Sequence, residues 1–261
     1  MKSKIADRLR LEREPVAIVF ADSKPEGALG FVEGKWGCVA ALHVAASRGR
    51  SAAFDRKTFG CPGGYTGLGF GNLARPGMAE FLSTGTPERA GEHYWKTPEL
   101  AQAFIDTMPQ VDVPCEFVLF KPLSEVDEAS EMPQVVTFYA NADQISALVV
   151  LANYGRRGVE NVISPMGAGC HTFCLYALAE ARREVPRAVL GMFDITARPL
   201  VEPHLLTFSM PYRLFQEMEG NVEGSFLETH DWGKVEARLP GMCGGDAAAS
   251  GVGTSSGGTS G

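Results

Sequence analysis

Short apolar runs recur along the chain, and they predict buried β-strands. Continuous rather than alternating apolar character is typical of strands that are covered on both faces of a sheet. The first run, Pro-Val-Ala-Ile-Val-Phe at 15–20, directly precedes a turn-rich segment. The predicted strands lie at 15–20, 52–55, 116–120, 134–139, 188–193 and 205–209.

Between these runs, apolar residues at helical spacing and capping residues predict helices. Asn141 and Asp143 are suited to cap a helix that starts at Gln144. Arg182 and Arg183 would complement the dipole at the end of a helix that starts at Cys170. The predicted helices lie at 3–13, 38–46, 78–82, 98–108, 144–153, 170–183 and 212–219.

This order of elements predicts an α+β fold, a mixed β-sheet with helices packed on it. Strands and helices alternate without the regular rhythm of a (β/α)₈ barrel, and no internal repeat is visible. We expect one globular domain over residues 1–243. Residues 244–261 are almost entirely Gly, Ala, Ser and Thr, which predicts a flexible tail.

Composition and charge exclude some classes of binding partner. The formal charge of −7 argues against nucleic acid and against an anionic membrane, because both are bound by basic surfaces. The longest apolar run, 145–152, is far shorter than the roughly 18 residues of a membrane span. The first residues do not resemble a secretory signal. We therefore expect a cytoplasmic protein whose six cysteines are reduced, and a homo-oligomer is compatible with the sequence.

One stretch, 58–71, holds six glycines, a proline and Cys61. Glycine at this density is favoured where the backbone turns sharply or lies close to a ligand. The stretch lacks the Lys-Ser/Thr of a P-loop and the Gly-x-Gly-x-x-Gly spacing, so a nucleotide is not indicated. We expect the backbone of Gly63 and Gly64 to approach a cofactor. A second small-residue turn, 164–169, ends at Gly169 and delivers Cys170 to a helix, and we assign Gly169 the same role.

Several short motifs together resemble the uncharacterised family numbered 169 among domains of unknown function. The resemblance runs from about Leu9 to Trp232 and implies a prokaryotic cytosolic protein, often from anaerobes, with no settled activity. It also implies that cysteines recur at the positions of Cys38, Cys61 and Cys170. The motifs are Cys38 before an Ala-rich helix, Cys61-Pro62-Gly63-Gly64 with Leu68-Gly69-Phe70-Gly71, Pro133-Gln134-Val135-Val136 with Asn141 and Gln144, Cys170, and Met210-Pro211-Tyr212.

Cys38, Cys61 and Cys170 each lie in a turn or at a predicted helix N-terminus, where thiolates are favoured. Three thiolates suit a [4Fe–4S] cluster with one iron open to a small ligand or to redox chemistry. Cys174, one helical turn after Cys170, is a candidate fourth ligand. The alternative for each cysteine is a small buried hydrophobe.

Three other chemistries stay open. Zinc could be bound by Cys61, Cys170 and His171, although no Cys-x-x-Cys pair supports it. A metal-free module could capture a small anion with the glycine-rich stretch and Arg156-Arg157. A thiol enzyme could use Cys61 or Cys170 as nucleophile with His171 as base. The expected partner is thus a small-molecule ligand or a redox partner.

Overall fold

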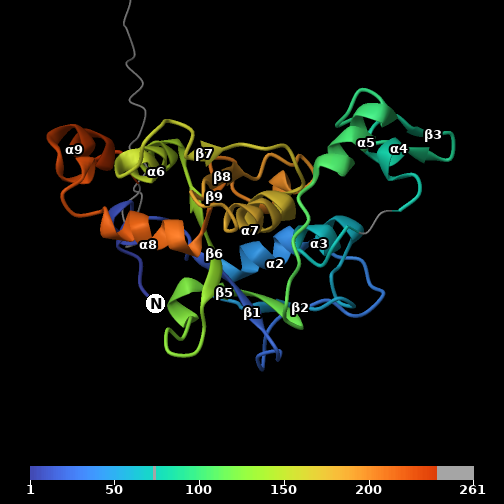
Figure 1. Cartoon of the computed structure of the whole chain (residues 1–261), viewed down its shortest axis with the longest axis horizontal. Helices are drawn as coiled ribbons and strands as arrows, with labels where there is room; N and C mark the ends of the chain where they lie inside the picture. The colour runs from blue at the N-terminus through green and yellow to red at the C-terminus, as the bar shows by residue number, and fades with distance from the viewer. Residues whose placement is uncertain (73–74, 240–261) are drawn as a thin grey trace, which may run out of the picture.

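A seven-stranded β-sheet organises the molecule (Figure 1). The computed structural model describes residues 1–72 and 75–239, so the predicted tail at 244–261 and Cys243 lie outside the described residues. The strand order is β2-β5-β1-β6-β9-β8-β7. Their bounds are β1 Val16–Ala21, β2 Ala52–Phe54, β5 Phe117–Pro122, β6 Pro133–Ala140, β7 Val162–Ile163, β8 Ala188–Gly191 and β9 Leu206–Pro211.

The sheet is mixed, as the sequence predicts. Strand β7 runs parallel to β8, while the other neighbouring strands are antiparallel. Strand β1 lies between β5 and β6, with Val16 opposite Pro122 of β5 and opposite Thr137 of β6. Both faces of the sheet are covered, which explains why its strands appear in the sequence as continuous apolar runs.

Two hydrophobic cores lie on the two faces of the sheet. Successive residues of β1 alternate between them, with Val16 and Ile18 in the first and Ala17 and Val19 in the second. The first face carries α2 Val39–Ala46, α3 Pro62–Gly67, a π-helix His171–Leu175 and α7 Tyr176–Glu180. The second carries α1 Lys4–Arg8, α6 Ala142–Tyr154, α8 Tyr212–Gly220 and α9 His230–Glu236.

Several predicted helices differ in their bounds. The first ends at Arg8 rather than at 13, because Arg10 has a φ of 50° that breaks the helix. The helix predicted over 170–183 begins as the π-helix and ends at Glu180. Asn141 and Gln144 form a capping box that starts α6, so Asn141 is the cap and Asp143 lies in the first turn.

The glycine-rich stretch is not purely a loop. It contains α3, with Cys61 as the N-cap residue and Pro62 in the first turn. Proline is tolerated there because the first N–H groups of a helix have no partner within it. The sequence missed this helix because glycine disfavours helical backbone in isolation.

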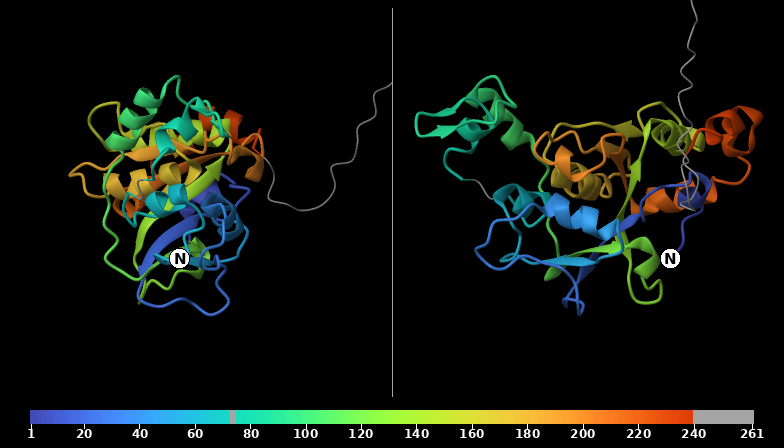
Figure 2. Two further views of the ribbon diagram at one scale, coloured as in Figure 1. Left: turned by 90° about the vertical axis from the view of Figure 1, so that its right-hand side faces the viewer. Right: turned by 180° about the vertical axis from the view of Figure 1, so that it is seen from behind.

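Residues 75–108 form a segment outside the two layers, at the upper right of Figure 1 and at the upper left of the rear view in Figure 2. It consists of α4 Met78–Leu82, the hairpin β3 Gly85–Thr86 and β4 Arg89–Ala90, and α5 Pro98–Thr107. Short 3₁₀ helices elsewhere span Leu123–Glu125, Arg198–Leu200 and Phe226–Glu228. Among the helices of the described residues, none has the length and apolar character that a membrane span requires.

Candidate functional site

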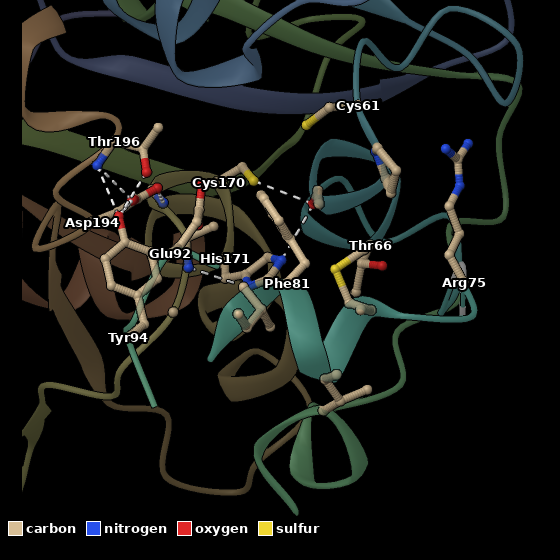
Figure 3. Close-up of a pocket in the computed structure, with 18 of the residues that line it drawn as sticks. Cys61, Thr66, Arg75, Phe81, Glu92, Tyr94, Cys170, His171, Asp194 and Thr196 are labelled. Atoms are coloured by element: carbon tan, nitrogen blue, oxygen red, sulfur yellow. Dashed lines mark hydrogen bonds between the residues drawn. The ribbon is translucent and has the colours of Figure 1, made fainter. Parts of the chain in front are cut away.

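A cavity of about 390 Å³ lies between the first face of the molecule and the segment 75–108 (Figure 3). The N-terminal ends of α2, α3 and the π-helix form one wall, and α4, α5 and the residues between them form the other. Ligand sites in proteins usually range from about 300 to 1,000 Å³. The cavity is therefore large enough to be a small-molecule or cofactor site.

Cys38, Cys61 and Cys170, the three cysteines predicted to form one site, all line this cavity. Cys38 is the exposed N-cap residue of α2, and Cys61 is the half-buried N-cap residue of α3. Cys170 is 6% exposed and directly precedes the π-helix. Three elements far apart in the sequence thus deliver one thiol each to the same cavity.

The predicted glycines lie directly beside these thiols. The carbonyl oxygen of Gly63 accepts hydrogen bonds from Cys170 Sγ at 3.3 Å and from His171 Nε2 at 3.2 Å. The N–H of Gly64 donates to Cys61 Sγ at 3.2 Å. The backbone of α3 therefore contacts two of the three sulfurs, and the predicted approach of Gly63 and Gly64 to a cofactor stays a prediction.

Glycine is also required for α3 to pack against Cys170. A Cβ atom at Gly67 would lie 2.5 Å from Cys170 Sγ, and one at Gly64 would lie 2.7 Å from Cγ2 of Val39. Real Cβ atoms do not approach other atoms so closely. Part of the glycine content of this stretch is thus explained by helix packing around the thiols.

Burial dominates the acid–base behaviour of two of the thiols. It raises the pKa of Cys61, and the N–H of Gly64 opposes part of this effect. The pKa of Cys170 is raised well above its usual value, first by burial and then by the neighbouring Cys61 and Cys38. Without a positive partner, these two groups are thiols at neutral pH. A bound metal would supply the positive charge that favours their thiolates.

His171 is a buried, neutral imidazole with a hydrogen-bond partner at each ring nitrogen. Its Nδ1 accepts the N–H of Ala168 at 3.3 Å, so the ring proton lies on Nε2, which donates to the carbonyl of Gly63. Burial lowers the pKa of His171 to about 4. Because neither nitrogen has a free lone pair for the thiol of Cys170, the geometry does not support the pairing of a nucleophile and a base.

Asp194 joins the two walls of the cavity. Its carboxylate accepts the N–H of Gly169 at 3.1 Å, the N–H of Thr196 at 3.0 Å and the hydroxyl of Tyr94 at 3.0 Å. Figure 3 shows Tyr94 reaching from the segment 75–108 to this carboxylate. Gly169, which the sequence predicts to contact a cofactor, therefore donates its backbone N–H to the carboxylate that connects the two walls.

The second wall consists largely of apolar side chains from the segment 75–108, including Phe81, Trp95 and Phe104. Arg89 and Glu92 add charge to it. Sequence analysis missed these residues and Asp194. An acidic residue three positions after the end of the buried strand β8 was the available signal for Asp194, whereas nothing local distinguishes the aromatic residues from core residues.

Other candidate residues lie elsewhere. Cys174 is fully buried in the first core and does not line the cavity, and Cys115 is half-buried outside it. Arg156 forms an ion pair with Glu217 and also contacts the carbonyl of Pro186, so it is not available to an anion in the cavity. In the part of the chain that the structure describes, no three histidine, cysteine or acidic side chains are grouped closely enough to hold a metal ion.

The fold and the cavity define a class, an α+β protein with a cavity into which three cysteines project from one wall. The chain belongs to the family DUF169, described as Uncharacterised ArCR, whose model matches residues 4–221. This match confirms the resemblance found in the sequence. No curated protein and no solved structure matches the chain.

Proposed function

We propose that this protein binds a [4Fe–4S] cluster through Cys38, Cys61 and Cys170, with one iron open to a small ligand or to redox chemistry. The observation that carries the proposal is that these three cysteines line one cavity from three separate elements. A core role does not account for an exposed Cys38 and a half-buried Cys61 in a cavity wall.

The size and surroundings of the cavity support a group larger than one ion. At about 30 Å³ per water, a volume of about 390 Å³ corresponds to on the order of a dozen water molecules. A cluster spreads its thiolates over several irons, so its ligands lie farther apart than those of a single ion. This suits three sulfurs that enter the cavity from different helices.

Backbone groups around the cysteines favour negative charge. The N–H of Gly64 already donates to Cys61 Sγ, and N–H groups that donate to sulfur tune the potential of iron–sulfur clusters. Cys38 lies at the positive end of the α2 dipole. The five cysteines of the described residues are free, which fits a reducing cytoplasm.

Three thiolates leave one iron of a cubane without a protein ligand. Cys174, predicted as a possible fourth ligand, lies in the apolar core, where burial raises the pKa of its thiol. Cys38, Cys61 and Cys170 would therefore be the protein ligands of the cluster. An open iron acts as a Lewis acid or exchanges electrons with a partner.

Anaerobic reconstitution with iron and sulfide tests the proposal. We expect visible absorption and about four irons and four sulfides per chain. Cys38→Ser, Cys61→Ser and Cys170→Ser should each lower the iron content, whereas Cys115→Ser and Cys174→Ala should not. A colourless wild-type protein without iron after reconstitution would overturn the proposal, and so would equal iron content in all five variants.

A further inference from the structure

The wall opposite the cysteines is built from aromatic rings. Phe81 of α4, Trp95 and Phe104 of α5 line the cavity and are only half-buried. Trp95 and Phe104 stack with centroids 5.0 Å apart and an interplanar angle of 27°. Half-buried ring faces in a mostly apolar cavity are suited to a flat apolar ligand body.

Arg89 supplies a cation to this wall. Its guanidinium lies over the ring of Phe81, 4.0 Å from the centroid, and it forms no ion pair with any residue that the structure describes. A guanidinium that lies on an aromatic ring keeps its N–H edge free, and that edge matches a carboxylate with two parallel hydrogen bonds. Arg89 is thus oriented by Phe81 and has donors available to a ligand.

Two protein carboxylates also line the cavity, but neither forms an ion pair with Arg89. Asp194 already accepts three hydrogen bonds, from Gly169, Thr196 and Tyr94. Glu92 lies beyond ion-pair distance of Arg89; burial and then the charge of Asp194 raise the pKa of its carboxyl group, and the attraction of Arg89 opposes part of this effect. A ligand anion therefore has Arg89 as a free partner.

We infer that the ligand of this cavity is a small planar organic carboxylate. Its carboxylate pairs with Arg89, and its flat body lies against Phe81 and Trp95. The inference deepens the proposed function and rests on it for the far end of the ligand, which would face the open iron. The aromatic wall and Arg89 do not depend on the cluster.

Calorimetric titration with three probes tests the inference. Benzoate is planar and anionic, benzamide is planar and neutral, and cyclohexanecarboxylate is anionic but not planar. We expect benzoate to bind about tenfold or more tightly than benzamide, because charge-assisted hydrogen bonds are the stronger kind. Cyclohexanecarboxylate should bind several-fold more weakly than benzoate.

Substitutions of the cavity residues test which side chain contacts which part of the ligand. Arg89→Gln should abolish the preference for benzoate over benzamide, and Phe81→Leu should reduce the preference for benzoate over cyclohexanecarboxylate. Arg157→Gln, an exposed arginine outside the cavity, is the matched control and should keep both preferences. Since Arg89 is exposed, its substitution should leave the fold intact, which circular dichroism would verify.

The titration is run on reconstituted and on cluster-free protein. Binding of benzoate to protein that never takes up iron would overturn the proposed function and support this inference. A clustered protein that binds none of the probes would overturn this inference and leave the cluster in place. An unchanged preference for benzoate in Arg89→Gln would also overturn it. Arg75 is the other arginine that lines the cavity, and loss of the preference in Arg75→Gln instead would overturn the assignment of the carboxylate to Arg89.

Discussion

The sulfur of Cys170 lies 2.5 Å from the position that a Cβ atom of Gly67 would occupy. Gly63 is in the same helix, and a Cβ atom there would meet only Cys61 Sγ, at 3.9 Å. Substituting alanine at each of the two glycines therefore distinguishes the effect of packing against Cys170 from the effect of helix propensity.

Gly67→Ala should destabilise the protein by about 1–3 kcal/mol, because overpacking forces α3 away from Cys170. It should also lower the iron content after reconstitution. Gly63→Ala should change stability little or raise it by up to about 1 kcal/mol, since alanine favours helix over glycine. Urea denaturation measures both changes. Equal effects of the two substitutions would show that the contact between Gly67 and Cys170 is unimportant.

The contributions of His43 and His171 to stability should fall as the pH falls below about 6.5. Burial lowers the pKa of His43 to about 3 and that of His171 to about 4 in the folded protein. At a pH between these folded-state pKa values and the unfolded pKa of about 6.5, the unfolded chain binds more protons than the folded protein. Lowering the pH in this range therefore favours unfolding. On going from pH 7 to pH 5, each histidine should lower the free energy of unfolding by about 2 kcal/mol.

His43→Leu isolates one of these contributions. His43 is fully buried, hydrogen bonds the hydroxyl of Tyr139 through Nδ1, and has no partner at Nε2. The variant should lose less stability than wild type between pH 7 and pH 5, by about 2 kcal/mol. Comparing the two proteins cancels the other titrating groups. Parallel pH profiles from urea titrations would contradict the prediction.

Tyr94→Phe should loosen the segment 75–108 from the rest of the molecule. The substitution removes the hydrogen bond to Asp194 and one of the two acceptors of the Thr196 N–H, at a cost of about 1–2 kcal/mol in local opening. Hydrogen exchange in residues 75–108 should become faster. Tyr154→Phe, which removes an exposed hydrogen bond to the carbonyl of Gly224, is the control and should leave exchange there unchanged.

Gln144→Ala should cost about 2–3 kcal/mol, because three roles are lost together. The side chain of Gln144 accepts the N–H of Asn141 and donates to the carbonyls of Leu9 and Arg10. Ser146→Ala, at an exposed position of the same helix, should be neutral or slightly stabilising. Thermal denaturation of the two variants compares a buried with an exposed polar side chain. A loss below 1 kcal/mol for Gln144→Ala would contradict the buried network.

Local sequence signals predicted most elements of the sheet and of its two helical layers. The apolar run at 134–139 became β6, and Asn141 with Gln144 became a capping box, because these signals act over a few residues. Strand β7 and helix α9 were missed, since their short segments carry no strong periodicity. Helix α3 was missed because its stability comes from packing against Cys170, which glycine permits.

By itself the sequence determined that Cys38 and Cys170 each precede a helix and that Cys61 lies in a glycine-rich turn, since turn residues and helix starts are local features. Only the tertiary structure decided that the three meet in one cavity, because residues so far apart in the chain are brought together by packing on one sheet face. The tertiary structure also decided that Cys174 is buried in the core and that Asp194 lies in the cavity wall. Periodicity shows which residues are buried, but the packing of the elements decides which of them share a cavity.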